Sequence, residues 1–205
     1  VYLAWQDHCR SAVTASEALD EGVAAPPPSG FDVTSACQQV RSRSVTLERR
    51  EPGPDGPEIN LEFSLDGNLK PHMVVVLDSI VRRASRPIRL FVLCRDHGPA
   101  DFSRLAELFP TVSFEWLPTD NVDYGAIGGM VQHITVATMD RLLLPDLLPE
   151  VQRVIHHDLD AVCLADLADL DAVDLGGHPI AAVTSPRARY RSGLGGFRGT
   201  AHRLR

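Results

Sequence analysis

From residue 58 onward, the sequence alternates between short apolar runs and longer segments whose apolar residues recur at helical spacing. This alternation restricts the possible folds more than any other feature of the chain. Most of the apolar runs are nearly continuous, as expected of strands that are buried on both faces. Such strands occur in parallel sheets covered by helices. The sequence therefore predicts an α/β fold with a mostly parallel sheet and flanking helices.

The apolar runs predict five strands, and the segments between them predict helices. We expect strands at residues 59–65, 88–94, 112–117, 151–155 and 179–183, with a short extension at 161–164. We expect helices at residues 70–84, 100–109 and 134–148. A further acidic run at 166–171 is typical of a helix face in contact with solvent.

Two proline-rich stretches, at residues 24–30 and 52–57, have the composition of linkers. We therefore expect a helical and linker segment at 1–57, with one or two short helices in 1–23, that could be the tail of an upstream domain. The α/β domain is expected at 58–185. Residues 186–205 hold six arginines and four glycines. We expect a mobile basic loop there, the start of an incomplete C-terminal part, in a chain that could be a piece of a longer protein.

Composition excludes several classes of function. With 20 Lys and Arg against 27 Asp and Glu, the formal net charge is −7, which argues against broad nucleic-acid binding. No stretch approaches the ~18 apolar residues of a transmembrane helix. The four cysteines are scattered, so we expect free thiols in a reducing compartment. These observations predict a cytoplasmic protein, either free or peripheral to a membrane.

The strongest candidate site follows the predicted strand at 151–155. Residues 156–160 read His-His-Asp-Leu-Asp, in the place where open parallel sheets bind ligands. Two carboxylates one residue apart can reach one divalent cation when the backbone turns between them, and oxygen ligands favour Mg²⁺ or Mn²⁺. About one or two D-x-D triplets are expected by chance in this chain, and a second one lies at 169–171, in the predicted acidic helix. The context favours Asp158 and Asp160.

Three further features have an ordinary structural interpretation beside a functional one. His156 and His157 could ligate a metal, but adjacent strand residues point to opposite faces, and we favour hydrogen-bonded histidines packed near the sheet. The Asp-Gly-Asn segment at 66–68 could read a base or ribose, although a turn with a helix cap is the simpler interpretation. Arg141 could neutralise phosphate, although an isolated helical arginine is usually a surface residue.

Several motifs with a defined chemistry do not occur in the sequence. There is no G-x-G-x-x-G after the first predicted strand of the domain, no G-x-x-x-x-G-K-[ST] and no G-x-S-x-G. There is also no H-x-H or H-E-x-x-H. A classical dinucleotide site, a P-loop, an α/β-hydrolase and a zinc site are therefore disfavoured.

Four segments, taken in order, resemble glycosyltransferase family 8, the group that includes glycogenin and bacterial lipopolysaccharide galactosyl- and glucosyltransferases. Residues 59–68 resemble the family's opening strand and its Asp-x-Asn nucleotide loop, and residues 133–142 resemble the helix that lines its sugar-nucleotide pocket. Residues 153–160 resemble the strand and the metal-binding D-x-D, and residues 166–183 resemble the segment that follows. The resemblance covers the chain from about residue 59 to about residue 183.

This resemblance implies a GT-A fold, a UDP-sugar donor, Mn²⁺ (or Mg²⁺) as the ion, and transfer with retention at the anomeric carbon. The residues that it assigns to nucleotide-sugar binding are Asp66, Asn68, Ile134, Thr138, Arg141, Asp158, Leu159 and Asp160. Among them, Asp158 and Asp160 would hold the metal. Asp66 and Asn68 would contact uracil or ribose, and Arg141 would lie near phosphate or sugar.

The sequence departs from the family pattern at three points. His156-His157 stands where the family usually has Tyr-Leu, and Leu69 stands where an aromatic residue often stacks on uracil. The family's later Asn-Ala-Gly and His-x-x-Gly-x-x-Lys-Pro-Trp motifs do not occur. We therefore expect the catalytic residues and the third metal ligand to lie beyond Arg205.

The leading hypothesis is a retaining glycosyltransferase that transfers a hexose from a UDP-sugar to an unknown glycan, lipid or protein acceptor. Residues 58–185 would form its GT-A nucleotide-sugar-binding domain. One alternative is a truncated or degenerate nucleotide-sugar-binding module without catalysis. The other is a metal-dependent phosphoester hydrolase or phosphotransferase that uses His157, Asp158 and Asp160.

Overall fold

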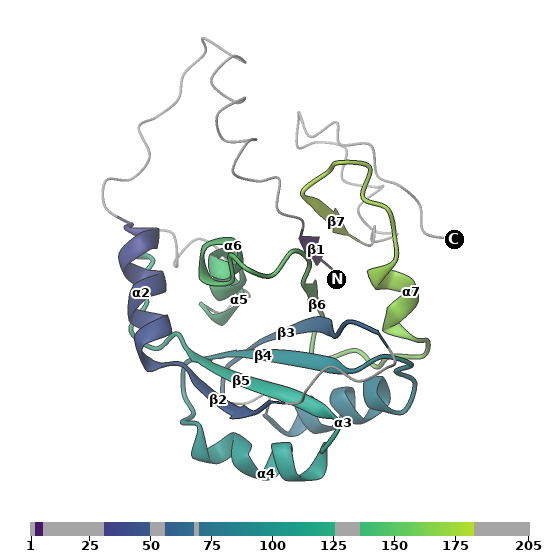
Figure 1. Cartoon of the computed structure of the whole chain (residues 1–205). Helices are drawn as coiled ribbons and strands as arrows, with labels where there is room; N and C mark the ends of the chain where they lie inside the picture. Colours follow the sequence, from purple (N-terminus) through teal and green to yellow (C-terminus); the bar gives the residue numbers. More distant parts are fainter. Residues whose placement is uncertain (1–2, 6–30, 50–55, 68–69, 126–135, 183–205) are drawn as a thin grey trace.

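The computed structural model of the chain describes residues 3–5, 31–49, 56–67, 70–125 and 136–182, with the backbone alone for 3–5. Within these residues, seven strands form one sheet in the order β2-β5-β4-β3-β6-β1-β7 (Figure 1). The strands are β1 (Leu3–Trp5), β2 (Val45–Glu48), β3 (Ile59–Leu65), β4 (Ile88–Cys94), β5 (Val112–Pro118), β6 (Ile155–His156) and β7 (Ile180–Ala182).

The centre of the sheet is parallel. Strand β3 pairs in parallel with β4 on one side and β6 on the other, and β4 pairs in parallel with β5. Strand β2 is antiparallel to β5, and β1 lies antiparallel between β6 and β7. Five of the seven strands therefore run in the same direction. This arrangement confirms the predicted α/β fold with a mostly parallel sheet.

Helices cover both faces of the sheet, as Figure 1 shows. Helices α3 (Lys70–Val81) and α4 (Ala100–Leu108) pack on one face, and α2 (Val33–Arg43) and α6 (Leu144–Leu147) pack on the other. The predicted helices at 70–84 and 100–109 are confirmed, and they end three residues and one residue earlier than predicted. Each helix buries an apolar face, so the sheet lies between two apolar layers.

Strand β4 illustrates why the apolar runs are continuous. Leu90 and Val92 belong to the apolar cluster under α3 and α4, whereas Phe91 and Leu93 belong to the cluster under α2 and α6. Side chains alternate between the faces of a strand with a period of two. A strand covered on both faces therefore needs an apolar residue at nearly every position.

Strand β3 places polar side chains beneath the site. Its odd-numbered residues are all buried in the cluster under α3 and α4: Ile59, Leu61, Phe63 and Leu65. The alternation puts Glu62 and Ser64 on the opposite face, which is contacted by the short helix α5 (Ala137–Asp140). A carboxylate on this central strand thus points into the layer that carries the candidate site.

The helix expected at 134–148 is not continuous. From Ala137 onward, the structure has α5, then a 3₁₀ turn η3 (Arg141–Leu143), then α6. Pro145 explains the break, because its ring removes one backbone donor and crowds the carbonyl four residues earlier. Ile134 lies outside the described residues.

The segment after α6 also differs from the expectation. The strand predicted at 151–155 is reduced to the two residues of β6, and 161–164 is not a strand. Val151 and Val154 both pack in the cluster under α2 and α6, and a spacing of three does not keep side chains on one face of a strand. The acidic run is helix α7 (Leu167–Asp171), and β7 confirms the last predicted strand.

The N-terminal residues contribute to the same sheet. Leu3–Trp5 is a strand rather than part of a helix, because hydrogen-bonded ladders to β6 and β7 satisfy its backbone on both sides. The rest of the helical prediction for 1–23 lies outside the described residues. Strand β2 and helix α2 precede the boundary predicted after residue 57, and both pack with elements of the predicted domain.

Two predictions from composition, on the state of the cysteines and on membrane-spanning helices, can be compared with the structure. Cys37, Cys94 and Cys163 are buried free thiols, as predicted, and Cys9 lies outside the described residues. Among the helices that the structure describes, none combines the length and the apolar character that crossing a membrane requires.

Candidate functional site

The candidate site lies at one edge of the sheet. The parallel strands β3, β4, β5 and β6 end at this edge, because strands that run in the same direction share it. The residues that follow the four strands are Asp66, Arg95, Thr119 and His157. Ligands of open α/β sheets bind at this edge, so the fold brings the predicted site residues Asp66 and Asp158 to one side of the molecule.

The two aspartates of the D-x-D triplet flank a buried residue. Leu159 packs in the apolar core, whereas the Asp158 side chain is 33% exposed and Asp160 is exposed at the surface. The backbone turns at residues 159–160. Leu159 therefore anchors the turn in the core, while the two acids beside it keep exposed surface. A backbone turn between the two acids is the local geometry expected of a shared cation site.

Both histidines before the triplet are buried and hydrogen-bonded. The Nδ1 atom of His156 lies 2.6 Å from Oε2 of Glu62, and its Nε2 lies 3.1 Å from Oδ1 of Asp158. The Nδ1 atom of His157 lies 2.7 Å from the carbonyl oxygen of Asp158, and burial lowers the pKa of His157. The favoured interpretation, histidines packed near the sheet, is confirmed. The direct contact between His156 and Asp158 was not predicted.

Glu62 extends this chain of polar contacts into the sheet. Its side chain has no exposed surface, and Ser64 Oγ donates a hydrogen bond of 2.5 Å to Oε1. Four side chains are therefore connected in the order Ser64, Glu62, His156, Asp158. An acid at a central position of a strand whose neighbours in the sheet are mostly apolar is the sequence signal that could have indicated this chain of contacts.

The metal implied by the resemblance can be tested against these side chains. Carboxylates are the oxygen donors that Mn²⁺ and Mg²⁺ take, so Asp158 and Asp160 fit such an ion as two of its ligands. In the parts of the chain that the structure describes, no three or more His, Cys, Asp or Glu side chains gather as a metal site. The described residues thus offer two ligands.

The loop that follows β3 is braced by the loop that follows β4. The Gly67 amide donates to Oδ2 of Asp96 at 2.9 Å. A Cβ atom at Gly67 would lie 3.4 Å from Nε2 of His97 and 3.5 Å from Oδ2 of Asp96, so the two loops are in close contact. This bracing fixes the backbone next to Asp66. Asn68 lies outside the described residues.

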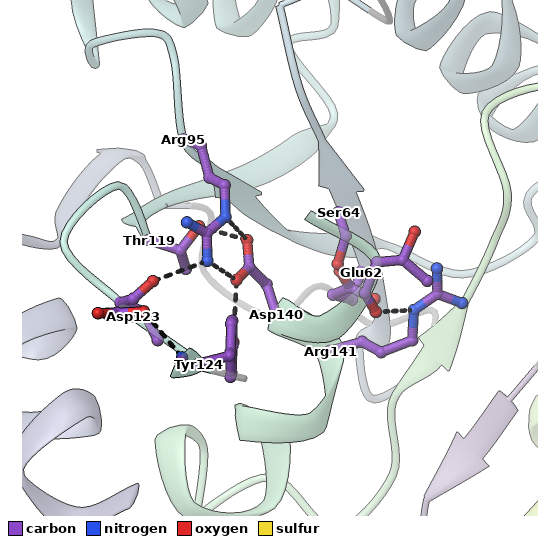
Figure 2. Close-up of polar contacts among 11 residues, drawn as sticks. Glu62, Ser64, Arg95, Thr119, Asp123, Tyr124, Asp140 and Arg141 are labelled. Atoms are coloured by element: carbon purple, nitrogen blue, oxygen red, sulfur yellow. Dashed lines mark hydrogen bonds and ion pairs between the residues drawn. The ribbon is translucent and has the colours of Figure 1, made fainter. Parts of the chain in front are cut away.

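A buried polar cluster fixes helix α5, which carries Thr138 and directly precedes Arg141. Asp140 has no exposed surface, and Arg95, Thr119 and Tyr124 converge on its carboxylate (Figure 2). Thr119 Oγ1 donates at 2.6 Å and the Tyr124 hydroxyl donates at 2.9 Å. Burial raises the pKa of Asp140, while the bonds from Arg95, Thr119 and Tyr124 oppose that rise. Burial, together with the charge of Asp140, raises the pKa of Tyr124.

The predicted pocket residues Thr138 and Arg141 lie next to this cluster. Arg141 Nε donates to the carbonyl oxygen of Thr138 at 2.9 Å, and Arg141 is half-buried. Figure 2 shows the Arg141 side chain pointing away from Asp140 and lying on the side of Glu62. Because Asp140 directly precedes Arg141, the cluster determines where the guanidinium can reach. An aspartate on the apolar face of the predicted helix was the overlooked signal for this cluster.

Comparisons with known proteins bear on this arrangement. Residues 60–194 match the model of the family described as glycosyl transferase family 8. A putative glycosyltransferase from Haemophilus influenzae is 24% identical over 127 residues, which cover 60% of this chain and 38% of that protein. The chain therefore spans well under half the length of this curated relative.

Two solved structures are similar in fold. The galactosyltransferase LgtC, in complex with donor and acceptor sugar analogues, aligns with a TM-score of 0.54 at 21% identity and covers 66% of this chain and 50% of that chain. The WbbM bifunctional glycosyltransferase aligns with a TM-score of 0.50 at 27% identity and covers 62% of this chain and 23% of that chain. The residues matched by the family model, 60–194, include the parallel strands and the turn that carries the D-x-D triplet. On this evidence the chain belongs to glycosyltransferase family 8 and has the GT-A fold.

Proposed function

We propose that the chain provides the nucleotide-sugar-binding part of a retaining hexosyltransferase, with a UDP-sugar as donor and Mn²⁺ or Mg²⁺ at Asp158 and Asp160. The observation that carries the proposal is the turn at the carboxyl end of β6. There, two acids flank the buried Leu159 at the edge where ligands of such sheets bind. Family membership supports a sugar donor and an acceptor.

The remaining predicted residues have roles that suit their places in the fold. Asp66 directly follows β3 in the braced loop, at the edge of the sheet where its carboxylate would contact a base or ribose. Arg141 carries a positive charge on the turn that faces β3, which suits the neutralisation of diphosphate. Asn68 and Ile134 would complete the contacts with the nucleotide and the sugar.

A divalent ion, when bound, would supply Lewis-acid stabilisation of charge on the departing nucleotide. The residues of this chain have simpler tasks. Asp158 and Asp160 hold the ion, Asp66 orients the nucleoside and Arg141 balances the charge of the phosphates. The acceptor, a glycan, a lipid or a protein, would bind outside these residues.

Titration calorimetry with UDP tests the proposal. We expect UDP to bind in the presence of Mn²⁺ and to bind at least about tenfold more weakly when Mn²⁺ is removed or when both aspartates are replaced (Asp158→Asn with Asp160→Asn), because each carboxylate contributes a charged ligand. The matched control is Glu107→Gln with Glu150→Gln, which removes two negative charges from exposed positions.

The control variant should bind UDP as the wild type does. Binding that survives the double aspartate substitution would contradict the proposal. So would the absence of binding in the wild type. Release of inorganic phosphate from a phosphoester, with no acceptor present, would instead favour a metal-dependent hydrolase.

A further inference from the structure

The pairing of β3 with β6 brings together two residues that are far apart in sequence. In the register of this parallel pair, Glu62 lies opposite His156. Opposed residues project from the same face of a sheet, and the ring nitrogen Nδ1 of His156 is 2.6 Å from the Glu62 carboxylate. Both side chains are almost completely buried, at 0% and 2% exposure. The histidine ring is therefore fixed from the side of the sheet.

The other ring nitrogen faces the first aspartate of the triplet. Nε2 of His156 lies 3.1 Å from Oδ1 of Asp158. An ionised carboxylate can only accept hydrogen bonds, so Nε2 is the donor in this contact. Because Glu62 fixes the ring, the direction of this donor is fixed as well.

We propose that His156 is a positioning residue, which holds Oδ1 of Asp158 so that the carboxylate keeps one orientation toward a divalent cation. This inference rests on the proposed function, because it assigns a purpose to His156 at the metal site that we propose there. Hydrogen-bonded partners of metal ligands contribute to affinity because they fix the ligand before the metal arrives. Ser64 belongs to the same support, since its hydroxyl occupies Oε1 of Glu62 and leaves Oε2 for the ring.

Two substitutions of His156 separate positioning from support of the fold. In His156→Gln, the side-chain amide reaches about as far as Nε2, so the donor to Asp158 is retained and the contact with Glu62 is lost. In His156→Asn, the shorter amide reaches about as far as Nδ1, so the contact with Glu62 is retained and the donor to Asp158 is lost. The matched control is His72→Asn, at an exposed position of α3.

The primary measurement is the binding of Mn²⁺ in the presence of UDP, followed by the electron paramagnetic resonance signal of the free ion. We expect the dissociation constant for Mn²⁺ to rise about 10- to 100-fold in His156→Asn. It should rise much less in His156→Gln and should not change in His72→Asn. Thermal unfolding of each variant, without metal, shows which of them remain folded.

The outcomes distinguish this inference from the proposed function. Equal Mn²⁺ affinity in the wild type and in a folded His156→Asn would overturn the positioning role and leave the metal site intact. A larger loss in His156→Gln than in His156→Asn would also overturn it, because the contact with Glu62 would then be the important one. No binding of Mn²⁺ by the wild type would remove the metal site and the positioning role together.

A second measurement works without metal and without a change at His156. The imidazole Nε2–H proton should give a nuclear magnetic resonance signal protected from exchange in the wild type. The signal should broaden or disappear in Asp158→Ala, a change at a half-buried surface position. An Nε2–H signal that is the same in both proteins would show that the ring does not donate to Asp158, and the inference would fail.

Discussion

The carboxylate of Asp140 receives two hydrogen bonds from the guanidinium of Arg95, at 2.7 Å from Nη2 to Oδ1 and 3.1 Å from Nε to Oδ2. Asp140 is fully buried, and the Arg95 side chain is 16% exposed. Arg95 follows β4 and Asp140 ends α5. The ion pair therefore joins the helix that carries Thr138 to the edge of the sheet where the candidate site lies.

Replacement of Arg95 should destabilise the fold strongly. In Arg95→Ala, the buried Asp140 loses its only cationic partner among the contacts described. Removal of one partner from a buried ion pair costs about 3–5 kcal/mol because a buried charge is left uncompensated. Urea unfolding monitored by circular dichroism should show this loss in the free energy of unfolding.

The double variant Arg95→Met with Asp140→Leu provides the control. It removes both charges, so it should be less destabilised than Arg95→Ala if the unpaired carboxylate is the cause. Arg82→Ala, which breaks an exposed pair within α3 and the following turn, should leave the unfolding midpoint unchanged. A small effect of Arg95→Ala would contradict the role assigned to the buried pair.

Asp166 should make stability depend on pH in the acid range. Burial raises the pKa of Asp166, but the hydrogen bonds from Ser85 and from the Ala168 amide outweigh burial and leave the pKa below its ordinary value. As pH falls, the unfolded state therefore takes up a proton first. The stability that Asp166 contributes is present above about pH 4 and is lost as pH falls through the folded-state pKa.

The measurement is urea unfolding of the wild type and Asp166→Ala at several pH values. Asp166 is the N-cap of α7, so the substitution should cost about 0.5–2 kcal/mol at pH 7. The difference between the two proteins should shrink as pH falls below about 4. A difference that grows toward acid pH would show that the carboxylate is not the stabilising form.

Arg141 should contribute to nucleotide affinity rather than to stability. A hydrogen bond to a charged group is worth about 1.5–3 kcal/mol, so Arg141→Ala should weaken UDP binding by about tenfold or more. Arg141→Lys should have an intermediate effect, because it keeps the charge and loses the planar fork. Calorimetry measures the affinities, with Arg104→Ala on the exposed side of α4 as the control. Unchanged affinity in Arg141→Ala would exclude contact with the phosphates.

The sequence predicts the fold correctly where the hydrophobic pattern of a segment matches the burial of its side chains in the structure. Strands β3 and β4 occupy the predicted residues because each buries nearly every side chain. The helix expected at 134–148 is interrupted by the 3₁₀ turn at Arg141–Leu143, just before Pro145, where the apolar spacing continues but the backbone geometry changes. Strands β1 and β2 were not predicted, because such short segments owe their conformation to the strands beside them rather than to their own residues.

In the candidate site, too, the features with a local sequence pattern were predicted and those made by distant residues were not. The sequence located the Asp158 and Asp160 triplet because a strand precedes it and the family pattern surrounds it. It did not reveal the contact between Glu62 and His156, which are 94 residues apart and meet only through the register of β3 and β6. The Asp140 cluster was missed for the same reason, since Arg95 and Thr119 come from the ends of two different strands.

The proposed function requires that one divalent cation binds between the two acids of the triplet. Crystals of the protein soaked with Mn²⁺ and UDP, and measured at the manganese absorption edge, test it directly. We expect one strong anomalous peak within ligand distance of carboxylate oxygens of both Asp158 and Asp160. A manganese peak elsewhere, or no peak while UDP is bound, would contradict it.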